Sequence, residues 1–192
     1  MTVLQRAAGA LLRRAGWKIS GARPDAPRYV LVASPHSSNW DTAVMLLFAA
    51  HFGIRLRWVG KRESFRWPLG PLLRRLGGIP IDRGGGRGVV ASTAEVFRGG
   101  EPLALAIAPD GTRRALDYWR SGFYHIARAA DVPLVLSFLD WGTHRAGIGP
   151  TMALTGNVGS DMDRIRAFYA GMVGRHPEQT SRVRLREEDG LE

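Results

Sequence analysis

The chain of 192 residues contains no cysteine. This absence excludes disulfide bonds, thiolate metal sites and a cysteine nucleophile. Long apolar runs are also missing, because the longest, near residues 43–52, is well short of the roughly 18 residues that a membrane-spanning helix needs. The first residues lack the apolar core and small-residue cleavage site of a secretory signal. We therefore expect neither an integral membrane protein nor a secreted one, and the expected location is the cytoplasm.

Acidic residues are scarce in the first part of the chain. Residues 1–75 hold 13 Lys and Arg against 3 Asp and Glu, whereas residues 76–192 hold 14 of each kind. The net charge of +10 therefore lies entirely in the first 75 residues. A surface with such an excess attracts anionic lipid, nucleic acid or a phosphorylated substrate.

Short β-rich runs alternate with segments of helical periodicity, and no internal repeat interrupts them. This order predicts one α/β domain, a mixed sheet flanked by helices, over residues 28–180. Residues 1–27 are expected to form an N-terminal amphipathic helix and a linker, and residues 181–192 a charged tail, of which "REEDGLE" (186–192) is expected to be frayed. Two further expectations are local: two strands joined at Gly149–Pro150, and a later helix with Ser160 as its N-cap.

The segment "SPHSSNWD" places His36 five positions before Asp41, between an apolar run and a helical one. In a continuous helix the two side chains would point about 140° apart in projection, so they can meet only across a turn. Pro35 breaks the strand that ends at Ser34, and Asn39 suits a helix start, which supplies that turn. Asp41 would then accept from one imidazole nitrogen and leave the other to take a proton from a hydroxyl. The plainer reading makes Asp41 a helix cap and His36 a surface turn residue.

Four blocks, in order, resemble the glycerolipid acyltransferase family, the group that contains the 1-acylglycerol-3-phosphate acyltransferases, in a compact bacterial form. The resemblance covers about residues 30–140. Together the blocks are specific, although each alone is short. Asp110 stands where the family has a glutamate, so its carboxylate is one methylene shorter. The blocks are "PHSSNWD" (35–41), "GGIPIDR" (77–83), "PDGTR" (109–113) and "VPLVL" (132–136).

The resemblance implies an O-acyltransferase of phospholipid synthesis. It would move a fatty acyl group from acyl-CoA or acyl carrier protein to a hydroxyl of a lysophosphatidic-acid-like or glycerol-phosphate acceptor. His36 would be the general base and Asp41 its orienting partner. Guanidinium groups suit phosphate because they donate paired hydrogen bonds. No metal is implied, and no cofactor beyond the acyl thioester substrate. The residues that would bind the acceptor are Arg83, Asp110, Gly111, Thr112, Arg113 and Lys61.

Two segments combine apolar and cationic residues in a way that suits a lipid surface. Residues 2–15 have helical spacing of apolar side chains with arginines opposite. Residues 55–75 mix seven cations with aromatic residues such as Trp58 and Trp67. Both could hold the protein on the anionic inner face of the cell membrane, where a lipid acceptor resides. The alternative is that the helix packs on the core and the arginines are solvated.

Other classes of protein remain open at this point. The basic N-terminal half and the Arg-Gly-Gly triplets at residues 83–85 and 98–100 are compatible with nucleic-acid binding, although both triplets also suit turns. A Ser-His-Asp lipid hydrolase would use Ser37, but no Gly-x-Ser-x-Gly elbow occurs. Acyl transfer, without nucleic acid or metal, is the preferred hypothesis. A metal site is disfavoured because no compact spacing connects its candidate ligands, which are His36, Asp41, His51 and His125.

Overall fold

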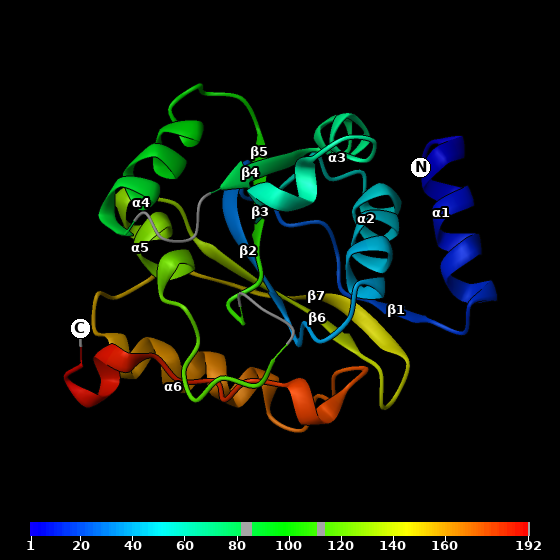
Figure 1. The fold of residues 1–192 in the computed structure, drawn as a ribbon. Coiled ribbons are helices and arrows are strands. Elements are labelled where there is room, and N and C mark those ends of the chain that lie inside the picture. Colours follow the sequence, from blue (N-terminus) through cyan, green and yellow to red (C-terminus); the bar gives the residue numbers. More distant parts are fainter. Residues whose placement is uncertain (82–85, 111–113, 192) are drawn as a thin grey trace.

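Within residues 1–81, 86–110 and 114–191, which the computed structural model describes, seven strands form one mixed sheet (Figure 1). Their order across the sheet is β1-β7-β6-β2-β5-β3-β4. The predicted single-domain α/β fold with a mixed sheet is confirmed. The strands are β1 (Lys18–Ser20), β2 (Arg28–Ser34), β3 (Leu56–Lys61), β4 (Gly78–Ile81), β5 (Leu103–Ile107), β6 (Leu134–Asp140) and β7 (Arg145–Met152).

Parallel pairing aligns the carboxyl ends of the central strands. β6, β2, β5, β3 and β4 run in the same direction, and β7 is antiparallel to β6. β2 lies between β5 and β6 and is buried along most of its length, which explains its continuous apolar run. The loop after β2 therefore emerges at the same edge as the ends of β5 and β6. Open α/β sheets bind ligands at this edge.

Helices cover both faces of the sheet (Figure 1). Leu31 of β2 belongs to the same buried cluster as Ala49 of α2, whereas Val30 belongs to a second cluster with Phe123 of α5 and Ile165 of α6. Successive residues of β2 therefore face α2 on one side and α5 with α6 on the other. The helices are α1 (Val3–Arg14), α2 (Trp40–Phe52), α3 (Gly70–Arg75), α4 (Gly86–Ala94), α5 (Gly122–Ala129) and α6 (Val158–Tyr169).

The predicted N-terminal helix is confirmed as α1, which packs beside α2. Thr2 caps it in a capping box with Gln5. Ala8 and Leu12 are buried, so one face belongs to the core. None of the helices in the described part of the chain is both long enough and apolar enough to cross a bilayer. The large apolar side chains that α1 leaves exposed are Val3, Leu4 and Leu11.

Two local expectations are wrong. Residues 145–152 form one strand, β7, because its pairing with β6 continues on both sides of Gly149 and Pro150. The N-cap of α6 is Asn157, whose side-chain oxygen accepts a hydrogen bond from the N–H of Ser160 at 3.0 Å. Ser160 therefore lies inside the first helical turn. The prediction chose the wrong residue because asparagine and serine are about equally favourable at an N-cap.

The expectation of fraying is also wrong for the described part of the tail, residues 186–191. Leu185 is fully buried, and the short 3-10 helix η4 (Arg186–Asp189) follows it. Glu188 of η4 forms an ion pair with Arg166 of α6 and accepts a hydrogen bond from the N–H of Leu185 at 2.7 Å. The charged side chains of this segment therefore dock it onto the domain.

Candidate active site

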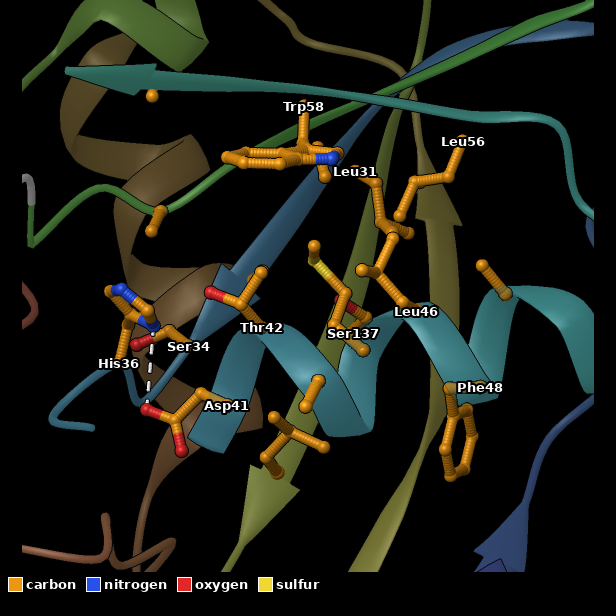
Figure 2. Close-up of a pocket in the computed structure, with 18 of the residues that line it drawn as sticks. Leu31, Ser34, His36, Asp41, Thr42, Leu46, Phe48, Leu56, Trp58 and Ser137 are labelled. Atoms are coloured by element: carbon orange, nitrogen blue, oxygen red, sulfur yellow. Dashed lines mark ion pairs between the residues drawn. The ribbon is translucent and has the colours of Figure 1, made fainter. Parts of the chain in front are cut away.

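The loop between β2 and α2 brings His36 and Asp41 together. His36 Nδ1 lies 3.3 Å from Asp41 Oδ2 (Figure 2). The side chain of Asp41 is only 3% exposed, whereas that of His36 is 23% exposed. The carboxylate is thus held inside the protein while the imidazole reaches its surface. The predicted contact across a turn is confirmed.

Asp41 also accepts hydrogen bonds from the loop before it and from a distant residue. Its Oδ2 accepts from the N–H groups of Ser37 at 2.9 Å and Ser38 at 2.8 Å. Its Oδ1 accepts from the indole Nε1 of Trp141 at 2.9 Å. Asp41 therefore holds the loop that precedes α2 and orients the imidazole as well. The helix-cap interpretation is wrong, because Asn39 stands at the N-cap of α2 and Asp41 lies inside its first turn.

These contacts set the charge of Asp41. Burial by itself raises the pKa of this carboxyl, but the hydrogen bonds from His36, Ser38 and Trp141 and the nearby charge of His36 outweigh it. The pKa of Asp41 is therefore held below its usual value. The carboxylate is ionised at neutral pH and suited to stabilise a protonated imidazole.

A second carboxyl, Asp110, lies beneath the same loop. It is fully buried and accepts hydrogen bonds from the N–H groups of His36 and Ser181, both at 3.3 Å, and from the Ser34 hydroxyl at 3.5 Å. Burial is the largest influence and raises the pKa of Asp110, although the hydrogen bonds from Ser181 and His36 oppose it. The resemblance implies that Asp110 binds substrate. In the structure its carboxylate instead joins the His36 loop to the C-terminal segment.

A cavity of about 850 Å³ lies between α2 and the sheet, beside His36 (Figure 2). Its α2 wall includes a row of residues three or four positions apart, which share one face of the helix. Figure 2 shows His36 toward one end of the cavity and Leu56 toward the other. The lining is largely apolar, as an extended hydrocarbon chain would require. Its α2 residues include Thr42, Met45, Leu46, Ala49 and Phe52, and its sheet residues include Leu31, Leu56, Trp58, Ala106 and Ile148.

Among the residues that the structure describes, Lys and Arg contribute two cationic side chains to the same cavity. Lys61, a predicted site residue, stands at the end of β3, and Arg114 follows the "PDGTR" block. Both are exposed, as a contact for a phosphorylated substrate must be. Arg114 was missing from the sequence-based site, although it directly follows a predicted arginine. Four predicted site residues lie outside the described residues: Arg83, Gly111, Thr112 and Arg113.

The geometry of Ser37 does not suit a nucleophile. Its side chain is 1% exposed, and its Oγ accepts a hydrogen bond from the N–H of His176 at 3.0 Å. The cavity-lining residues that the structure describes do not include it. Because Ser37 supports the C-terminal segment from inside the loop, its hydroxyl is not placed to attack an acyl group in the cavity.

The histidines considered as metal ligands lie apart from the pair. His51 Nδ1 is 3.1 Å from the carbonyl oxygen of Gln5, and His125 Nε2 is 3.1 Å from a carboxylate oxygen of Glu187. Over the described ranges of the chain, no three His, Asp or Glu side chains converge as a metal site would require. The contacts of these two histidines hold α1 and η4 to the domain.

Comparison with known proteins identifies the family. The family model described as Acyltransferase matches residues 19–136, more than half of the chain, and this range includes His36, Asp41 and Asp110. The chain belongs to the acyltransferase family. The predicted resemblance and the predicted enzyme class are confirmed. None of the curated proteins matches this acyltransferase.

Among solved structures, the acyltransferase resembles the crystal structure of the 1-acyl-sn-glycerophosphate (LPA) acyltransferase PlsC from Thermotoga maritima. The TM-score is 0.56 and the sequence identity 15%, and the match covers 80% of this chain and 70% of that chain. At this identity the likeness establishes a shared fold.

Proposed function

We propose that this acyltransferase moves a fatty acyl group from acyl-CoA or acyl carrier protein to a hydroxyl of a lysophosphatidic-acid-like or glycerol-phosphate acceptor. The observation that carries the proposal is the His36–Asp41 pair beside a large apolar cavity that Lys61 and Arg114 also line. The pair can deprotonate a hydroxyl, the cavity can take a hydrocarbon chain, and the cations can bind a phosphate. The name of the PlsC relative supports the acceptor class.

His36 is the general base in this mechanism. With its Nδ1 proton directed at Asp41, its Nε2 takes the proton of the acceptor hydroxyl. As the hydroxyl oxygen attacks the thioester carbonyl, the C–O bond forms, the C–S bond breaks, and the imidazolium returns the proton to the leaving thiolate. Ionised Asp41 stabilises the imidazolium during this exchange. The thioester is already activated, so no acyl-enzyme is needed.

The acyl chain occupies the cavity along α2. Thr42 and Phe52 are ten positions apart on its wall, which corresponds to about 15 Å of helix. A zigzag of carbon–carbon bonds of about 1.5 Å advances roughly 1.3 Å per carbon, so this length holds a chain of about 12 carbons. Burial of each methylene contributes about 0.8 kcal/mol, which makes the cavity a strong determinant of donor affinity.

Lys61 and Arg114 bind the phosphate of the acceptor in this proposal. Both line the cavity, and each lies at or after the carboxyl end of a parallel strand: Lys61 ends β3, and Arg114 follows β5. A lysine supplies a point charge and an arginine supplies paired donors, so together they hold and orient one phosphate. Arg83 and Arg113 remain candidates for the same task on the resemblance alone.

An anionic membrane, the cytoplasmic face of the cell membrane, supplies the lipid acceptor. The turn before α3 exposes Trp67 at 87%, and Lys61 and Leu73 of the same region line the cavity. A lipid docked here would therefore meet the site directly. Apolar side chains surrounded by cations suit an anionic headgroup layer. The exposed apolar residues of this docking patch are Trp67, Leu69, Leu72 and Leu76, and its arginines are Arg62, Arg66, Arg74 and Arg75.

Sedimentation with lipid vesicles tests the membrane proposal. We expect binding to vesicles rich in phosphatidylglycerol and much weaker binding to phosphatidylcholine. The double variant Trp67→Ser, Leu72→Ser should lose most of this binding, and Leu11→Ser tests the exposed face of α1 separately. Val96→Ser, which changes an apolar residue exposed elsewhere, is the control. Binding that depends neither on the charge of the lipid nor on these substitutions would contradict the proposal.

Thiol release from palmitoyl-CoA tests the reaction. We expect release that depends on lysophosphatidic acid or glycerol phosphate and that His36→Ala abolishes without a change in the far-UV circular dichroism spectrum. His125→Ala, which removes an exposed histidine of α5, should retain full activity. Near-normal turnover by His36→Ala would refute the assignment. Salt-sensitive DNA binding without thiol release would favour the nucleic-acid hypothesis instead.

A further inference from the structure

Trp141 reaches the catalytic pair from a distant part of the sequence. It follows β6, which pairs in parallel with β2 so that Phe138 lies opposite Ser34. The chain after β6 therefore extends past the end of β2, where the catalytic loop begins. There the indole Nε1 of Trp141 donates a hydrogen bond of 2.9 Å to Oδ1 of Asp41, across 100 positions of sequence.

The two oxygens of Asp41 have different partners. Oδ2 faces His36 and also accepts from the backbone of Ser37 and Ser38, whereas Oδ1 accepts from Trp141. A carboxylate held through one oxygen can still turn about its Cβ–Cγ bond. The indole N–H opposes that rotation and keeps Oδ2 directed at the imidazole.

Trp141 is itself firmly held, as a positioning residue must be. Its backbone N–H donates to the carbonyl oxygen of Val173 at 2.9 Å. Its ring meets the buried ring of Trp17 edge-on, with centroids 4.9 Å apart, and the guanidinium of Arg175 lies 4.9 Å from its centroid. These contacts come from two separate segments, one at Trp17 and one at Val173 and Arg175, so the indole has little freedom to leave Asp41.

We propose that Trp141 is a positioning residue for acyl transfer, which acts on His36 through the hydrogen bond of its indole N–H to Asp41. The inference rests on the proposed function. Trp141 contacts neither substrate nor cofactor in this role, and the cavity-lining residues that the structure describes do not include it. Its loss should therefore affect the catalytic step and leave substrate binding intact.

Trp141→Phe tests the inference, because it keeps a packed ring and removes the N–H. We expect kcat to fall roughly tenfold, the usual effect of losing a hydrogen bond to a charged group, with KM for donor and acceptor changed less than twofold. Trp119→Phe is the matched control, since the Nε1 of Trp119 is buried and has no hydrogen-bond partner among the described residues. An equal loss of kcat in both variants, or an unchanged kcat in Trp141→Phe, would overturn the inference.

A double-mutant cycle with Asp41→Asn separates positioning from packing. If Trp141 acts through Asp41, Trp141→Phe should lower kcat little further in the Asp41→Asn background. Additive losses would mean that the ring supports the fold and not the carboxylate. Should Trp141→Phe fail to fold, replacement of Trp141 by benzothienylalanine keeps the indole shape without the N–H, and the same loss of kcat is expected.

A measurement without substrate distinguishes failure of this inference from failure of the proposed function. The indole N–H proton resonance of Trp141, assigned by its loss in Trp141→Phe, should move upfield in Asp41→Asn because the bond to a charged acceptor is lost. If the wild-type protein transfers no acyl group, the proposed function fails, and this resonance still decides whether Trp141 holds Asp41. An unmoved resonance would show that the hydrogen bond does not form.

Discussion

Ala49→Leu should shorten the acyl chain that the enzyme prefers. Ala49 lies on the cavity wall seven positions beyond Thr42, or about 10 Å along α2, whereas Phe52 lies at about 15 Å. A leucine at this point fills the far third of the cavity. The roughly 5 Å that it closes correspond to about four methylenes at roughly 1.3 Å each. Their burial is worth about 3 kcal/mol, so long donors should lose roughly 100-fold in kcat/KM.

The assay compares kcat/KM for acyl-CoA donors from octanoyl to stearoyl with one acceptor. Short donors should react as they do with the wild type, because their chains end before the new side chain. Ala167→Leu, at an exposed position of α6, controls for the substitution itself. Thermal melts of Ala49→Leu should show a free energy of unfolding lowered by no more than about 3 kcal/mol, the upper end of the usual effect of adding side-chain volume inside a protein. A profile in which all chain lengths fall equally would refute the placement of the acyl chain along α2.

Three further predictions concern polar residues of the site. Asp41 has a lowered pKa, so its ionised form stabilises the fold. Thermal melts of Asp41→Asn should therefore show lower stability than the wild type at pH 7, and this difference should disappear as pH falls below about 3.9. Asp110 has a raised pKa, so the free energy of unfolding of the wild type falls as pH rises above about 3.9. In the same melts, the stability of Asp110→Asn relative to the wild type should therefore be higher at pH 7 than at pH 4. Lys61→Ala and Arg114→Ala should each raise the acceptor KM about tenfold with little change in kcat, whereas the surface variant Arg164→Ala should change neither constant. Equal changes in the acceptor KM of all three variants would disprove the phosphate assignment.

The sequence predicted the local part of the site well. His36 and Asp41 are five positions apart, and the proline, serines and asparagine around and between them left a turn as the only arrangement that joins them. The apolar run of β2 and the helical period of α2 placed that turn at the end of a strand. Each of these features depends on a few neighbouring residues, which is the range over which sequence patterns are informative.

The rest of the site depends on contacts between distant segments. Trp141 meets Asp41 only because β6 lies beside β2, and Asp110 meets Ser181 only because the C-terminal segment returns to the loop. The cavity likewise follows from the distance between α2 and the sheet, which no residue pattern encodes. Arg114 was overlooked because the "PDGTR" block of the resemblance ends at Arg113, and sequence alone does not show that the next arginine lines the cavity.

The C-terminal segment has a consequence for the order in which the enzyme is built. Ser37 and Asp110 receive hydrogen bonds from the N–H groups of His176 and Ser181, which are made long after the loop they support. Translation must therefore pass Ser181 before the loop that carries His36 and Asp41 gains these two hydrogen bonds. A nascent chain halted before His176 would carry His36 and Asp41 and yet lack the hydrogen bonds that support their loop from the C-terminal segment.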